Sequence, residues 1–74
     1  MNAKELVLNE FHSLIWFCHK NDYDSRKAEQ HFYRFRGILW ALRETGQISE
    51  EYRYLMSMNA RKAFMKAEKK HKGE

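Results

Sequence analysis

The side chains best suited to bind a metal ion or act as a nucleophile are histidines and one cysteine, mostly in the first half of the chain. His12 and His19 stand seven residues apart, which is about 10.5 Å along a helix and too far for both to bind one ion. Cys18 falls among apolar helix positions, so a buried, unreactive thiol is expected. His31 belongs to a different predicted helix. We therefore expect no catalytic residue, no metal site, no cofactor and no enzymatic activity.

Another group of residues is suited to binding rather than to a reaction. Four aromatic and arginine residues follow one another at spacings of three and four, on one side of a predicted helix: Tyr33, Arg36, Trp40 and Arg43. Such residues dominate binding between proteins, and they also stack on bases and hold phosphates. Packing of cations over rings within the chain is a third interpretation. Gly37, between Tyr33 and Trp40, would suit the close approach of a partner's backbone.

Helices must position these residues, because the 74-residue chain has no proline and few glycines to interrupt them. The predicted helices span about 3–20, 25–45 and 50–69. Gly46 is expected to end the second helix in a left-handed conformation. The expected N-cap residues, in chain order, are Asn2, then Asp24 or Ser25, then Ser49. We expect residues 1–74 to form one α-helical domain.

Apolar residues recur at helical spacing in all three segments, which favours helices over strands. The expected core positions of the first helix are Val7, Leu8, Phe11, Leu14, Ile15 and Cys18. Those of the second are Ala28, Phe32, Phe35, Leu39 and Leu42. Those of the third are Tyr52, Leu55, Met56, Ala63 and Ala67. The predicted fold is all-α, a helical hairpin with a third helix across it, forming a three-helix bundle.

More large apolar side chains are present than such a small core can bury. Those expected to point outward are Leu6, Trp16, Phe17, Tyr33, Trp40, Tyr54, Met58, Phe64 and Met65. Each aromatic ring can bury about 150 to 250 Å², so their exposure would leave an unusually large apolar patch. A homodimer or another protein partner would cover it, and a wider core within one chain is the alternative. The expected partner-binding residues are Trp16, Phe17, Tyr33, Arg36, Trp40 and Arg43.

The net charge of +4 lies entirely at the C-terminal end. Residues 1–60 contain eight basic and eight acidic residues, whereas 61–74 contain six basic and two acidic residues. Binding of nucleic acid is therefore an alternative to binding of protein. Solvation of a helix end explains the charge equally well, and attachment to a membrane surface through Phe64 and Met65 is a third interpretation. The candidate phosphate contacts are Arg61, Lys62, Lys66, Lys69 and Lys70.

Neither an export signal nor a membrane-spanning segment is expected. The apolar run from Leu14 to Cys18 is five residues long, whereas a helix needs about 20 residues to cross a bilayer. A single cysteine cannot form an internal disulfide, so a reducing, cytoplasmic location is expected.

Two resemblances to known families concern the middle of the chain. Residues 41–55 loosely resemble a helix-turn-helix, although Leu42 and Gln47 stand where that family has a small and an apolar residue. The segments FRGILWAL (35–42) and TGQI (45–48), with an acidic helix start at 50–52, resemble short uncharacterised helical proteins of phages and conjugative elements of Gram-positive bacteria. The second resemblance implies an accessory or regulatory protein that acts by binding.

Overall fold

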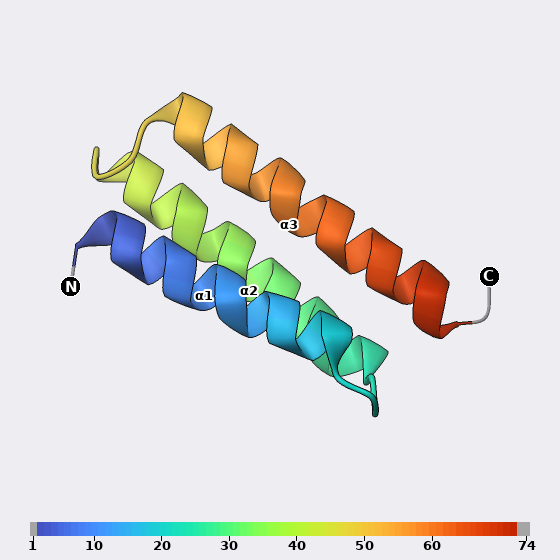
Figure 1. Cartoon of the computed structure of the whole chain (residues 1–74). Helices are drawn as coiled ribbons and strands as arrows, with labels where there is room; N and C mark the ends of the chain where they lie inside the picture. Colours follow the sequence, from blue (N-terminus) through green and yellow to red (C-terminus); the bar gives the residue numbers. More distant parts are fainter. Residues whose placement is uncertain (1, 73–74) are drawn as a thin grey trace.

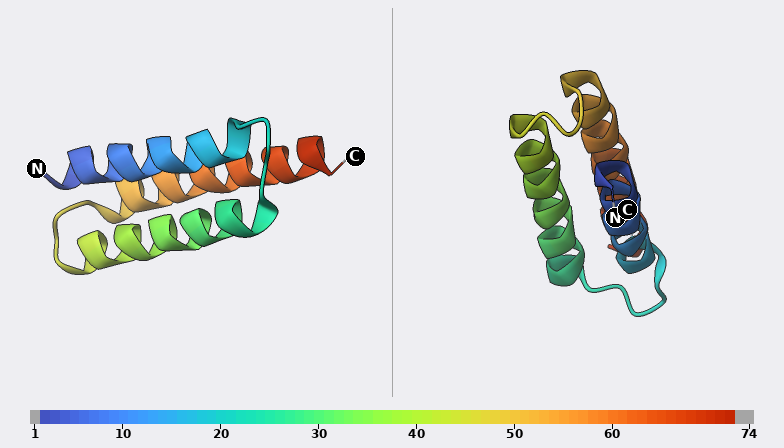
Figure 2. Two further views of the ribbon diagram at one scale, coloured as in Figure 1. Left: turned by 90° about the horizontal axis from the view of Figure 1, so that it is seen from below. Right: turned by 90° about the vertical axis from the view of Figure 1, so that its left-hand side faces the viewer.

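Three helices joined by two short connections form the chain in the computed structural model, which describes residues 2–72. The helices are α1 (Ala3–His19), α2 (Ser25–Glu44) and α3 (Glu50–His71). Successive helices run in opposite directions and lie side by side along a molecule that measures 40 × 21 × 14 Å (Figure 1; Figure 2). The prediction of an all-α, three-helix fold is confirmed, with helix ends within two residues of the expected ones. No helix in the described part of the chain is long and apolar enough to span a bilayer.

Local sequence determines where each helix begins and ends. The Asn2 side chain accepts a hydrogen bond of 2.8 Å from a backbone N–H in the first turn of α1. Asp24 accepts from two backbone N–H groups of α2, so Asp24 rather than Ser25 is the N-cap. Ser49 accepts a bond of 3.0 Å at the start of α3. Each cap satisfies a donor that would otherwise lack a helical partner, and Gly46, with φ of 74°, ends α2 as predicted.

One apolar core lies along the axis enclosed by the three helices. Phe35 and Leu39 are fully buried at its centre, and the ring of Phe35 packs on Phe11 with 5.7 Å between centroids. All five core positions predicted for α2 are buried, because their alternating spacing keeps them on one side of the helix. The buried side chains contributed by the rest of the chain are Val7, Leu14, Cys18, Ile48, Met56, Ala60 and Ala67.

Four of the sequence-based burial predictions are wrong, and Phe17 and Met58, also expected to point outward, are half-buried. Leu8 and Leu55, expected in the core, are 45% and 56% exposed, whereas Leu6 and Phe64, expected to point outward, pack against the core. The buried arc of a helix depends on the direction from which its neighbours approach, and α1 faces the seam between α2 and α3. On α3 the small side chain of Ala60 occupies the core-facing position instead of Leu55. The predicted core residues left half-buried are Phe11, Ile15, Tyr52 and Ala63.

Candidate functional site

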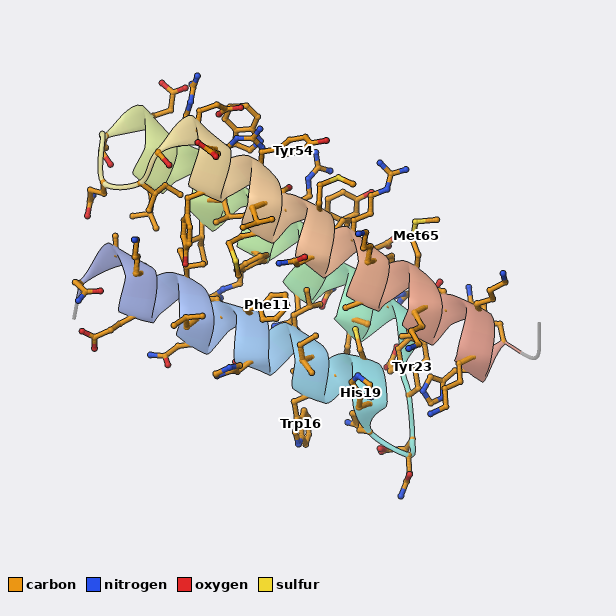
Figure 3. The ribbon with its side chains drawn as sticks, turned by 45° about the horizontal axis from the view of Figure 1, so that its top comes forward. Phe11, Trp16, His19, Tyr23, Tyr54 and Met65 are labelled. Atoms are coloured by element: carbon orange, nitrogen blue, oxygen red, sulfur yellow. The ribbon has the colours of Figure 1, made fainter. Side chains whose placement is uncertain are left out.

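A groove runs between α2 and α3 on the side of the molecule away from α1. Tyr54 and Met65 lie along this outer edge of α3 (Figure 3). The groove has a volume of about 420 Å³, within the size range of small binding pockets. We call this surface the α2–α3 groove, and its lining residues are Phe32, Tyr33, Arg36, Arg53, Tyr54, Ser57, Met58, Arg61, Phe64 and Met65.

The floor of the α2–α3 groove is apolar. Phe32 of α2 and Phe64 of α3 stack with 5.1 Å between ring centroids and 12° between ring planes. Phe32 is buried and Phe64 half-buried, so the pair joins the core to the groove. Tyr33 and Tyr54 border this floor, and both are more than half exposed. The exposure predicted for these two tyrosines is confirmed.

Arginines supply all the formal charge of the groove lining, which contains no carboxylate. The Arg36 guanidinium lies over the rings of Phe32 and Tyr33, 5.8 and 5.9 Å from their centroids. Arg36 and Arg61 form no ion pair with any carboxylate of residues 2–72. Arg53, the third arginine, is neutralised by Glu50. Two positive charges are therefore available to a ligand in this groove.

Trp40 and Arg43, both predicted to bind a partner, lie in a cluster of contacts within the chain. The Arg53 guanidinium lies 4.1 Å and that of Arg43 5.4 Å from the centroid of the Trp40 ring. Arg53 is buried and makes two hydrogen bonds to Glu50, of 2.8 and 2.7 Å, while Arg43 Nε lies 3.1 Å from Glu50 Oε1. Hydrogen bonding from Arg53 holds the pKa of Glu50 below its usual value. We call Trp40, Arg43, Glu50 and Arg53 the Trp40 cluster. Its contacts match the third interpretation of these residues, the packing of cations over rings within the chain, although Trp40 remains 41% exposed.

The helix-turn-helix interpretation is wrong. The two helices of that motif cross at about 90–120°, whereas α2 and α3 lie antiparallel along their lengths (Figure 2). Arg53, which would have to reach a base at the start of the second helix, is buried against Trp40 and Glu50.

Trp16 and Phe17 lie on a different side of the molecule from the α2–α3 groove. Trp16 is 59% exposed and projects from α1 away from the other helices (Figure 3). Lys20 Nζ lies 4.8 Å from the centroid of its ring. Phe17 is half-buried and stacks on His31 of α2 at 4.1 Å. The six predicted partner-binding residues are thus divided among three places: the α2–α3 groove, the Trp40 cluster and the side of α1 that carries Trp16.

The five predicted phosphate contacts do not form one surface. Arg61 lines the α2–α3 groove, while Lys66 and Lys70 border a hollow against Cys18 and His19 of α1. Lys66 and Lys69, with Lys72, line a second hollow beside Met65, a residue that this hollow shares with the groove. Lys62 is exposed and lines none of these three hollows. The five basic residues are therefore spread over more than one side of α3.

A polar junction that the sequence did not predict ties the α1–α2 connection to the end of α3. The hydroxyl groups of Tyr23 and Ser25 both donate to Glu68 Oε2, the second at 2.7 Å, and Lys72 Nζ lies 3.0 Å from Glu68 Oε1. The Tyr23 ring stacks on His71 at 4.5 Å. Hydrogen bonding from Tyr23 holds the pKa of Glu68 below its usual value. We call Tyr23, Ser25, Glu68, His71 and Lys72 the Glu68 junction. Its only signal in the sequence is the four-residue spacing of Glu68 and Lys72, which is typical of an ion pair on one helix.

Cys18 is buried, as predicted. Burial raises the pKa of its thiol, which disfavours the reactive thiolate. Across residues 2–72, no three histidine, cysteine or acidic side chains are arranged to hold a metal ion.

Comparison with known proteins found no relative of the chain. No protein-family model, no curated protein and no solved structure matches the chain.

Proposed function

We propose that the chain is a small, non-enzymatic binding module that docks another protein in the α2–α3 groove. The observation that carries this proposal is one groove in which exposed tyrosines and unpaired arginines border an apolar floor. Tyrosine and arginine are enriched among residues that dominate binding between proteins. An accessory or regulatory protein that acts by binding, as the resemblance to phage and conjugative-element proteins implies, would use such a surface.

A second copy of the chain is proposed to bind at Trp16. Its ring is exposed, and within residues 2–72 its ring contacts are Lys20 and Phe17, both on or next to the same helix. Isologous pairing would bring the two Trp16 rings together across a twofold axis. This pairing leaves the α2–α3 groove free, because Trp16 projects from α1 on another side of the molecule (Figure 3).

Nucleic-acid binding is the second candidate function. It is favoured by the unpaired Arg36 and Arg61 beside Tyr33 and Tyr54, since single strands bind where aromatic rings and cations lie together. The distribution of the C-terminal lysines around α3 counts against it, because a polyanion requires a continuous basic track.

A photo-crosslinking experiment distinguishes these proposals. Replacing Tyr54 by benzoylphenylalanine places the crosslinker at the rim of the groove, and the same replacement of Lys62 provides an exposed control outside it. In cells that express the protein naturally, we expect discrete protein adducts from position 54 that are reduced by Arg36→Glu. Equal adduct patterns at both positions would contradict docking in the groove. Nuclease-sensitive adducts at position 54 would support nucleic-acid binding instead.

Light scattering tests the proposed homodimer. We expect the wild-type mass to be that of two chains and the mass of Trp16→Ala to be that of one. A dimer that persists in Trp16→Ala but dissociates in Tyr33→Ala would place the homodimer in the groove and contradict both assignments.

A further inference from the structure

The charges left unpaired in the α2–α3 groove specify the chemistry of its partner. We infer that the groove receives an amphipathic helix whose apolar stripe is bordered by aspartate or glutamate residues, as a fourth helix of the bundle. This inference rests on the proposed docking function and adds the partner's secondary structure and charge.

The dimensions of the groove suit a short helix. It extends along α3 from Arg53 to Met65, which is about 18 Å at 1.5 Å per residue. A partner helix of about three turns would cover this length. Four-helix bundles are completed in this way, by a helix that packs into the groove between two antiparallel neighbours.

The apolar floor suits the side chains that a docking helix inserts. Helices bind in grooves through apolar residues at positions i, i+3, i+4 and i+7. The stacked rings of Phe32 and Phe64 provide a flat apolar surface for such residues near the Met65 end of the groove. Met58 and Met65 lie along the α3 wall, and flexible methionine side chains adjust to the shape of the inserted group.

The two walls of the groove each present one unpaired cation. Contacts between Phe32 and Phe64 and between Trp40 and Arg53 set the register of the two antiparallel helices, which places Arg36 opposite residues 57–60, next to Arg61 in the sequence. Carboxylates on both sides of an apolar stripe would therefore meet Arg36 on one wall and Arg61 on the other. Arginine binds carboxylates through two parallel hydrogen bonds. A basic helix would meet like charges on both walls.

The same observations disfavour two other occupants. In an isologous contact a second copy would present the same groove, so the Arg36 and Arg61 of one chain would face those of the other. A polynucleotide needs successive cations along its path, but the groove lining offers only Arg36 and Arg61 unpaired, and Lys66 and Lys69 lie beyond its end at Met65. An acidic helix requires only the two arginines that are present.

Selection from a displayed peptide library tests the inference without knowledge of the natural partner. Each peptide would carry leucine at i, i+3, i+4 and i+7, with the flanking positions varied among Glu, Gln and Lys. We expect the full-length protein to enrich peptides with flanking Glu. The double variant Arg36→Glu/Arg61→Glu should reverse the preference to Lys and lower the affinity for a selected acidic peptide at least about tenfold.

A matched control has the same change in net charge outside the groove. Lys62→Glu/Lys70→Glu alters two exposed residues that do not line it, so the preference for Glu should persist. Enrichment of Gln or Lys by the wild-type protein would overturn the proposed partner chemistry and leave the docking function standing. No enrichment over Tyr33→Ala/Tyr54→Ala would overturn both. If a fluorescent oligo-dT binds and loses its affinity in Arg36→Glu/Arg61→Glu while no peptide is enriched, the occupant is a nucleic acid.

Discussion

Replacement of Glu68 by glutamine should destabilise the fold through the Glu68 junction. The carboxylate accepts hydrogen bonds from Tyr23 and Ser25 and pairs with Lys72. Glutamine keeps one acceptor oxygen and the same volume, but it removes the charge and directs an N–H₂ group toward one of these donors. Hydrogen bonds to a charged group contribute about 1.5 to 3 kcal/mol each when well buried. Because Glu68 is partly exposed, we expect a net loss of about 1 to 2 kcal/mol.

The loss of stability in Glu68→Gln should become smaller at acidic pH. Hydrogen bonding in the folded state lowers the pKa of Glu68 below the unfolded value of 4.5. A lowered pKa stabilises the fold above the unfolded pKa, and this stabilisation disappears as the pH falls through the folded pKa. The difference in unfolding free energy between wild type and Glu68→Gln should therefore be constant at neutral pH and diminish below about pH 4.5.

Thermal unfolding followed by far-ultraviolet circular dichroism measures this difference. For a domain of this size the melting temperature should fall by about 4 to 8 °C per kcal/mol. Glu29→Gln is the matched control, because Glu29 is an exposed carboxylate of α2 that forms no ion pair within residues 2–72. Combining Glu68→Gln with Tyr23→Phe should cost less than the sum of the two single changes, since both remove the same bond. A loss that is absent at pH 7, or that grows on acidification, would refute the reasoning.

The remaining predictions concern the helix surface, the Trp40 cluster and the thiol. Gly37→Ala should raise the unfolding free energy by about 0.5 to 1 kcal/mol, because a Cβ at this exposed helical position meets no atom within 4 Å; chemical denaturation measures it, and destabilisation would contradict it. Arg53→Ala should lower the melting temperature more than Arg43→Ala, because buried Arg53 makes two hydrogen bonds to Glu50; equal losses would contradict that assignment. Cys18 should react with a thiol reagent at the rate of global unfolding, since it is buried and its pKa is raised; rapid labelling of the native protein would show otherwise.

Features fixed by neighbouring residues could be predicted from the sequence. Asn2, Ser49 and Gly46 act through hydrogen bonds or dihedral angles within a few residues, and each has its predicted role. The buried side of α2 was also predictable, because one long amphipathic pattern determines it. For the same reason the Tyr33 and Arg36 wall of the α2–α3 groove followed from their spacing on α2.

Features that depend on how the helices pack could not be predicted in this way. Leu6 and Leu8 flank the buried arc of α1 on opposite sides, and only the positions of α2 and α3 decide which of them packs against the core. The sequence around Arg53 predicts an exposed side chain, because nothing in it shows that Trp40 of another helix packs against the guanidinium. Tyr23 and Glu68 are 45 residues apart, so no local pattern joins them.

Within residues 2–72, the Trp40 cluster and the Glu68 junction connect α2 to α3 at opposite ends of the α2–α3 groove. The Trp40 cluster joins the end of α2 to the start of α3, and the Glu68 junction joins the start of α2 to the last turns of α3. The spacing of the walls is thereby fixed at both ends before any ligand arrives. Preorganisation of this kind lowers the entropic cost of association, which would favour the proposed docking of a helix.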